Sequence, residues 1–129
     1  ICSPKGFEPK LEILEKAQSL SQFGSEINIS NDISESTKQA QVIYTDVWAS
    51  MGQEEEQLKR KKFFENYVVN QELIEIADKD VIILHCLPAH RGEEITEEAL
   101  ESKHSRVFEQ AENRLHVQQA LLAAQLGGL

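Results

Sequence analysis

The sequence of 129 residues contains only two cysteines, Cys2 and Cys86, and no long hydrophobic run. Two cysteines cannot build a disulfide framework, and the simplest expectation is therefore a reducing cytoplasm. No apolar run approaches the roughly 18 residues that a membrane-spanning helix requires, and no cleavable signal is visible at Ile1. The sequence predicts a globular protein of the cytoplasm with no membrane partner.

Positive charge is scarce as well. The sequence has 13 Lys and Arg residues and 22 Asp and Glu residues, a formal net charge of −9, and basic side chains gather only at residues 59–62. A nucleic-acid partner would favour a basic face, so we expect no nucleic-acid partner. Hydrophobic residues make up 40% of the chain, enough for one domain with its own core. The chain starts without methionine and apparently at the end of a strand, which indicates a fragment of a longer protein.

Helical and extended patterns alternate along the chain. Apolar spacing predicts helices over residues 9–24, 33–39, 53–67, 70–77, 96–100 and 111–126. Alternating or continuous apolar runs predict strands over residues 26–30, 42–45, 81–84 and 106–108. This alternation is typical of an α/β fold with a doubly wound parallel sheet and helices on both faces, a partial Rossmann-like domain.

Polar residues follow the strands at the points where they end. Residues 81–84 are apolar, β-branched at three of four positions, and stop at a His-Cys pair. Ligands of open α/β sheets bind outside the carboxyl ends of the strands. If the strands are parallel, Asp46, Ser50, Cys86 and Arg114 converge on one edge of the sheet.

Other interpretations of these residues stay open. A cysteine alone is more often a buried core thiol than a catalytic one, and an Asp after a strand is more often a turn former or a cap. A metal site from His85, Cys86 and His90 is conceivable, although no closed four-ligand spacing exists. A Cys-His nucleophile is also conceivable, although no known signature surrounds the cysteine. Its base would be one of four histidines: His85, His90, His104 or His116.

Three segments carry a family resemblance. They are Asp-Val-Trp-Ala-Ser-Met-Gly-Gln-Glu at 46–54, His-Cys-Leu-Pro at 85–88 and Ala-Glu-Asn-Arg at 111–114. In this order, and with Pro-Lys-Gly-Phe-Glu-Pro at 4–9, they closely resemble signature segments of the ornithine carbamoyltransferases. The Ser-Met-Gly and His-Cys-Leu-Pro segments distinguish this family from the aspartate carbamoyltransferases.

The resemblance implies transfer of a carbamoyl group from carbamoyl phosphate to the side-chain amine of L-ornithine. The products would be L-citrulline and phosphate, in arginine biosynthesis or urea cycle-type metabolism, without a metal or organic cofactor. The family is built from trimers whose amino-terminal domain binds carbamoyl phosphate. Residues 1–110 would form most of the ornithine-binding α/β domain, incomplete at its amino end. Residues 111–129 would form a helix that packs on the missing carbamoyl-phosphate domain.

The resemblance also assigns roles to individual residues. Asp46 would bind the α-ammonium of ornithine, with Ser50 and Met51 in a loop that closes over the amino acid. Cys86 would contact the reacting amine and help to remove its proton. Arg114 would stabilise charge on the carbamoyl oxygen or the phosphate. A guanidinium suits a step in which an oxyanion forms and phosphate leaves.

The resemblance further implies that the Leu87 carbonyl holds the carbamoyl NH2 group and that the Leu87–Pro88 peptide is cis. The family's phosphate-gripping Ser-x-Arg-Thr-Arg segment and the first strand and helix of the ornithine domain are absent, so we expect this chain to be inactive alone. Two other functions stay open. One is a non-catalytic binding domain, and the other is a sister carbamoyltransferase for putrescine or an acylated ornithine.

Overall fold

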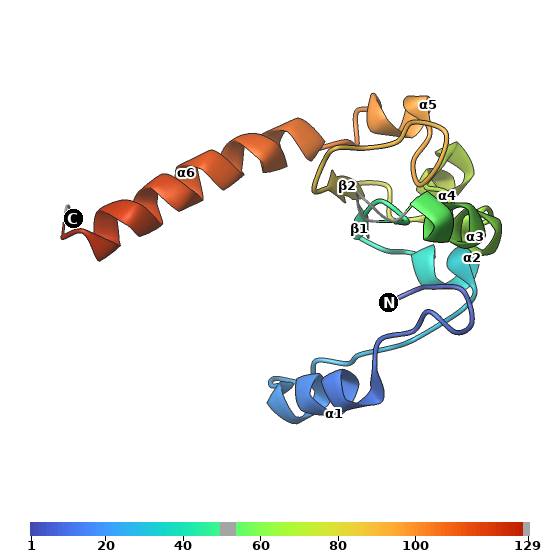
Figure 1. The fold of residues 1–129 in the computed structure, drawn as a ribbon, viewed down its shortest axis with the longest axis horizontal. Helices are drawn as coiled ribbons and strands as arrows, with labels where there is room; N and C mark the ends of the chain where they lie inside the picture. The colour runs from blue at the N-terminus through green and yellow to red at the C-terminus, as the bar shows by residue number, and fades with distance from the viewer. Residues whose placement is uncertain (50–53, 128–129) are drawn as a thin grey trace.

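The computed structural model describes residues 1–49 and 54–127 of the chain (Figure 1). In the described residues, pairs of helices alternate with single strands, because the strands predicted at 26–30 and 106–108 do not form. In chain order the elements are α1 (Leu11–Leu20), α2 (Ile33–Thr37), β1 (Val42–Thr45), α3 (Glu54–Phe64), α4 (Gln71–Ile76), β2 (Ile82–His85), α5 (Glu97–Leu100) and α6 (Val107–Gln125).

The strands β1 and β2 form a parallel pair. Their register runs from Val42 opposite Ile82 to Thr45 opposite His85, so both strands end at the same edge. Ser105 extends the pairing by one parallel bridge to Ile83 on β2. The α/β class with a parallel sheet is therefore confirmed, and the end of the sheet that the sequence marks as functional is formed by neighbouring strands.

The core lies against β2. Ile83 is fully buried, and apolar side chains from the neighbouring helices and loops surround it. The buried cluster consists of Val69, Ile74, Val81, Ile83, Ile95, Ala99, Leu100 and Val107. Because α2 packs against α4 and α4 against α5, these short helices form one layer beside the sheet (Figure 1).

The strand at 42–45 is less buried than its apolar sequence predicts. Ile43 packs against the core, but Val42 is 50% exposed and Tyr44 is 56% exposed. Alternate residues of a strand point to opposite faces of the sheet. In the part of the chain that the structure describes, no layer covers the face that carries Val42 and Tyr44.

Two predicted strands are replaced by single paired residues, and several helices differ from their predicted bounds. The helices α1, α2 and α3 end earlier than predicted, whereas α6 begins at Val107 instead of residue 111. Residues 106–108 are not a strand, because Ser105 alone pairs with β2 and Val107 already begins α6. Val107 buries its β-branched side chain from the first turn of a helix, which explains the misleading strand pattern. Within 26–30 only Ser30 pairs, with Cys2. The first helix, predicted to reach residue 24, ends at Leu20.

The helix α6 leaves the body of the molecule, and its carboxyl end lies far from the sheet (Figure 1). Its 19 residues span about 28 Å. Val107 is its one buried residue among those described, whereas Leu115, Leu121 and Leu122 are exposed. No helix in the described ranges is long and apolar enough to cross a bilayer.

Candidate functional site

The ends of β1 and β2 bring Asp46 and Cys86 into contact. The Cys86 thiol donates a hydrogen bond to Asp46 Oδ1 at 2.9 Å. The Val47 N–H donates to the same oxygen at 2.7 Å. The predicted convergence of Asp46 and Cys86 at one sheet edge is confirmed, because each residue directly follows one of two paired strands.

The carboxylate holds Cys86 in its thiol form. The hydrogen bond to Asp46 raises the pKa of the Cys86 thiol above its ordinary value, and burial and the Asp46 charge raise this pKa further. Both side chains lie in exposed residues, so a ligand can reach them. The pair therefore presents a negative carboxylate beside a neutral sulfur to any ligand at this edge.

The segment after Cys86 has an unusual backbone. The Leu87–Pro88 peptide is cis, as the family resemblance implies, and Leu87 has a φ of +52°. Positive φ values are unfavourable for residues with a branched side chain. The Leu87 N–H donates to Nδ1 of His85 at 2.8 Å, and this bond holds Leu87 in place.

His85, which directly precedes Cys86, forms a fully buried pair with Glu94. Because His85 Nδ1 accepts from Leu87, Nε2 carries the ring proton and meets Glu94 Oε1 at 3.1 Å. The His90 N–H donates to the same carboxylate oxygen at 2.6 Å. Both ring nitrogens of His85 are thus engaged, and neither is free to act as a base for Cys86.

The two histidine alternatives find no support in this arrangement. The His90 ring nitrogen Nδ1 lies 3.8 Å from Glu94 Oε2, beside the buried pair. Over the described ranges, no three or more His, Cys, Asp or Glu side chains are placed to hold a metal ion. Nothing in the sequence predicts the burial of Glu94, which lies in a turn just before a short helix. The burial of His85 could be predicted, because alternate residues of a strand face the same side of the sheet and Ile83 is apolar.

A glutamine connects α6 to both strand ends. Gln110 Oε1 accepts from the His85 N–H at 3.0 Å, and Gln110 Nε2 donates to the Tyr44 hydroxyl at 3.0 Å. Arg114 lies one turn further on the same face of α6, because residues four apart in a helix are neighbours. Among the described residues, no hydrogen bond or ion pair joins Arg114 to Asp46 or Cys86. Ser50 and Met51 lie outside the described residues.

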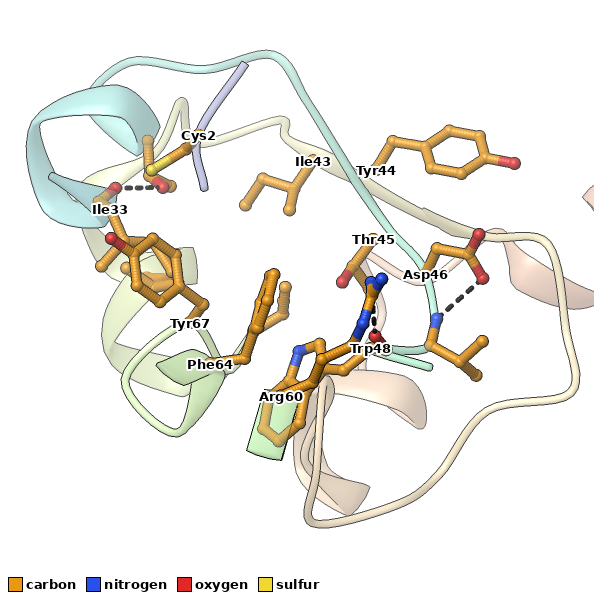
Figure 2. A pocket seen from close by; sticks show the side chains of 14 residues that line it. Cys2, Ile33, Ile43, Tyr44, Thr45, Asp46, Trp48, Arg60, Phe64 and Tyr67 are labelled. Atoms are coloured by element: carbon orange, nitrogen blue, oxygen red, sulfur yellow. Dashed lines mark hydrogen bonds between the residues drawn. The ribbon is translucent and has the colours of Figure 1, made fainter. Parts of the chain in front are cut away.

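A cavity of about 340 Å³ opens beside β1. Cys2 and Ile43 lie on one side of this cavity, and Phe64, Trp48 and Arg60 lie on the opposite side (Figure 2). The rings of Trp48 and Phe64 are 6.0 Å apart. Asp46 also lines this cavity, so the site adjoins an open space rather than a packed core.

This domain belongs to a class of carbamoyltransferases. A family model described as aspartate/ornithine carbamoyltransferase, Asp/Orn binding domain, matches residues 1–125, and the chain is a member of that family. The resemblance carried by the three sequence segments is thereby confirmed at the level of the family.

The individual relatives point to one branch of the class. The chain is 63% identical over 129 residues to the ornithine carbamoyltransferase of a Prochlorococcus marinus strain, with 100% of this chain and 41% of that protein covered. It is 57% identical over 123 residues to the Oceanobacillus iheyensis ornithine carbamoyltransferase, covering 95% and 38%. The structure of the Pyrococcus furiosus ornithine carbamoyltransferase matches with a TM-score of 0.87 and 46% identity, covering 98% and 41%. The chain thus spans about two fifths of the length of these relatives.

Proposed function

We propose that the full-length protein transfers a carbamoyl group from carbamoyl phosphate to L-ornithine, giving L-citrulline and phosphate. The observation that carries this proposal is the contact between Asp46 and Cys86 at the ends of β1 and β2. Family membership and relatives named ornithine carbamoyltransferase support it. The arrangement offers a carboxylate for an amino-acid ammonium and a thiol for a second amine.

The charges at the site suit this substrate. In the proposal, the α-ammonium of ornithine binds Asp46 and the reacting amine contacts Cys86. A cation at Asp46 offsets the negative charge that raises the pKa of the thiol, so substrate binding favours release of the thiol proton to solvent. The resulting thiolate of Cys86 can then accept the proton of the reacting ammonium. The Leu87 carbonyl accepts from the carbamoyl NH2 group, and Arg114 donates to the developing oxyanion or the phosphate.

The rest of the enzyme is supplied by regions outside this chain. In the proposal, residues 1–110 form the ornithine-binding domain, and residues 111–129 pack on a carbamoyl-phosphate domain in a homotrimer. The exposed apolar residues of α6 support this contact. The cavity between Cys2 and β1 supports a further strand there, because β1 pairs only with β2 among the described residues. Two free thiols support a location in the cytoplasm.

The experiment is an assay of citrulline formation by the purified full-length protein. Arg114→Ala should lower kcat by about 10²- to 10³-fold, the usual effect of losing one oxyanion donor. Cys86→Ala should lower it by about 10²-fold, the lower limit for a group that assists proton transfer. Wild-type rates in both variants would refute the roles given to these residues.

The choice of amine separates this proposal from its alternatives. Ornithine, N-acetylornithine and putrescine are offered to the same enzyme at equal concentration. We expect ornithine to give the highest kcat/KM, because N-acetylornithine has no α-ammonium for Asp46 and putrescine, although it keeps an ammonium on the equivalent carbon, lacks the α-carboxylate of an amino acid. Preference for either other amine would make the protein a sister enzyme, and absence of carbamoylation of all three would favour a binding domain.

A further inference from the structure

We propose that Gln110 is a positioning residue, which sets the placement of Arg114 by tying α6 to the ends of β1 and β2. The inference rests on the proposed function, since Arg114 acts on the carbamoyl group only in that reaction. It adds a residue outside the three signature segments to the site.

The helix α6 has few other contacts with the sheet. Val107, at its first position, is the one residue of α6 that is buried in the part of the chain described here. One apolar side chain fixes the end of a helix but not its rotation about the long axis. A second, directional contact is needed to define which residues face the strand ends.

Gln110 supplies this directional contact. Its amide oxygen accepts from the main-chain N–H of His85, the residue directly before Cys86, at 3.0 Å. Its amide nitrogen donates to the hydroxyl of Tyr44, the residue two before Asp46, at 3.0 Å. One side chain therefore contacts both strands next to the residues that form the site.

Helix geometry carries this constraint to Arg114. Four residues along a helix correspond to a rise of about 6 Å and a rotation of about 40°. The side chain of Arg114 therefore projects from the same stripe as Gln110, one turn further from Val107. Without the two amide contacts, rotation of α6 displaces the guanidinium, and a displacement of about 1 Å can cost about 10²-fold in rate.

The test is a double-mutant cycle in the full-length enzyme. Gln110→Ala should lower kcat by about 10- to 100-fold, since it misplaces Arg114. The KM for ornithine should change little, because Asp46 and Cys86 stay in contact. In an Arg114→Ala background, Gln110→Ala should cause no further loss, because residues that act through one another are not additive.

Three further variants sharpen the test. Gln110→Glu should keep most of the wild-type kcat, unlike Gln110→Ala. One carboxylate oxygen can accept from the His85 N–H and the other can accept from the Tyr44 hydroxyl. Gln110→Asn keeps the amide but is one methylene too short, and it should behave like Gln110→Ala. Glu109→Ala changes an exposed residue in the same turn and should leave the rate unchanged.

Two results would overturn the inference while the proposed function stands. One is a wild-type rate for Gln110→Ala, and the other is a full additional loss when Gln110→Ala is combined with Arg114→Ala. If Gln110→Ala does not fold, Tyr44→Phe removes only the hydroxyl of an exposed side chain and the cycle is repeated with it, under the same criteria. A wild-type enzyme that forms no citrulline would instead refute the proposed function and, with it, this inference.

Discussion

The chemistry proposed for this domain depends on a single hydrogen bond between Cys86 and Asp46. The bond keeps the thiol protonated as long as the carboxylate is unpaired, since both the bond and the charge raise the pKa of the thiol. A substrate ammonium at Asp46 would reverse part of that effect. Recognition of one amine and preparation of the group that contacts the other would then be coupled through two neighbouring side chains.

Replacement of Asp46 by Asn should make Cys86 more reactive. The amide keeps an acceptor oxygen but removes the negative charge, so the pKa of the thiol falls toward its ordinary value. Because the thiolate is the reactive form, alkylation by iodoacetamide at pH 8 should become several-fold faster, and the pH profile of the rate should move to lower pH. Both the parent full-length protein and its Asp46→Asn variant carry Cys2→Ser, so that alkylation of Cys2 does not contribute to the measured rate. An unchanged or slower alkylation rate would contradict the contribution that the Asp46 charge makes to the raised pKa of the thiol.

A second group of residues, which does not contact the substrate in the proposal, holds the backbone of the site in place. Glu94 accepts from both the His85 ring and the His90 main chain, and His85 in turn accepts from the Leu87 main chain. A buried carboxylate with two donors fixes its neighbours because an unpaired donor in the core is costly. The backbone that carries the Leu87 carbonyl is therefore held by side chains that do not contact the substrate.

At the scale of the element, short polar side chains cap the starts of three helices, whereas α1 and α6 begin without a side-chain cap. Asp32, Asn70 and Thr96 each accept a hydrogen bond from the main chain three residues later. The helix that follows Asn70 buries Leu73 and Ile74 in the body of the domain. Its cap therefore stabilises a contact of the core as well as a helix end.

Asn70→Ala should destabilise the domain by about 1 kcal/mol, the usual cost of losing an amino-terminal cap. Asn70→Asp is the matched control, since a carboxylate oxygen can still accept from the Leu73 N–H, now at 3.0 Å from Asn70 Oδ1. Urea unfolding of the full-length protein gives both free energies. Equal losses in the Ala and Asp variants would argue that Asn70 acts through another contact.

The elements that depend on local pattern were predictable from the sequence. The cap at Asn70 and the buried strand at 81–84 are examples, because residue type and spacing within about ten residues specify both. The exposure of Val42 was not predictable, since it depends on whether another layer covers that face of the sheet. The strand predicted at 106–108 failed for a related reason. A buried Val107 fits a strand or a first helical turn equally well.

The residues of the site were likewise predictable only in part. Asp46 and Cys86 were found because parallel strands end together, an argument that needs only their order. Glu94 and Gln110 were missed because neither directly follows a strand in the sequence, and only the fold brings each of them to the strand ends. Gln110 meets His85, which precedes it by 25 positions, and Tyr44, which precedes it by 66.

At the scale of the whole molecule, the exposed apolar surfaces lie where other parts of the enzyme are expected. The chain spans about two fifths of its relatives. One face of β1 and most of α6 carry exposed apolar side chains, including Tyr44 and Leu122. Both exposed surfaces are explained by the proposal that a second domain packs on this one in the full-length protein.

Hydrogen exchange in the isolated chain and in the full-length protein tests this proposal directly. A helix of modest length without packing is marginal in water, so the amides of residues 115–124 should exchange much faster in the isolated chain. The Ile83 amide donates to the His104 carbonyl within the core at 2.9 Å, and it should be protected in both samples, as the control for folding. If residues 115–124 exchange equally in both while Ile83 stays protected, the second domain does not cover α6. Faster exchange confined to α6 in the isolated chain, the expected result, would support the proposal that Gln110 and Val107 fix only the first turn and that the second domain sets the direction of the rest.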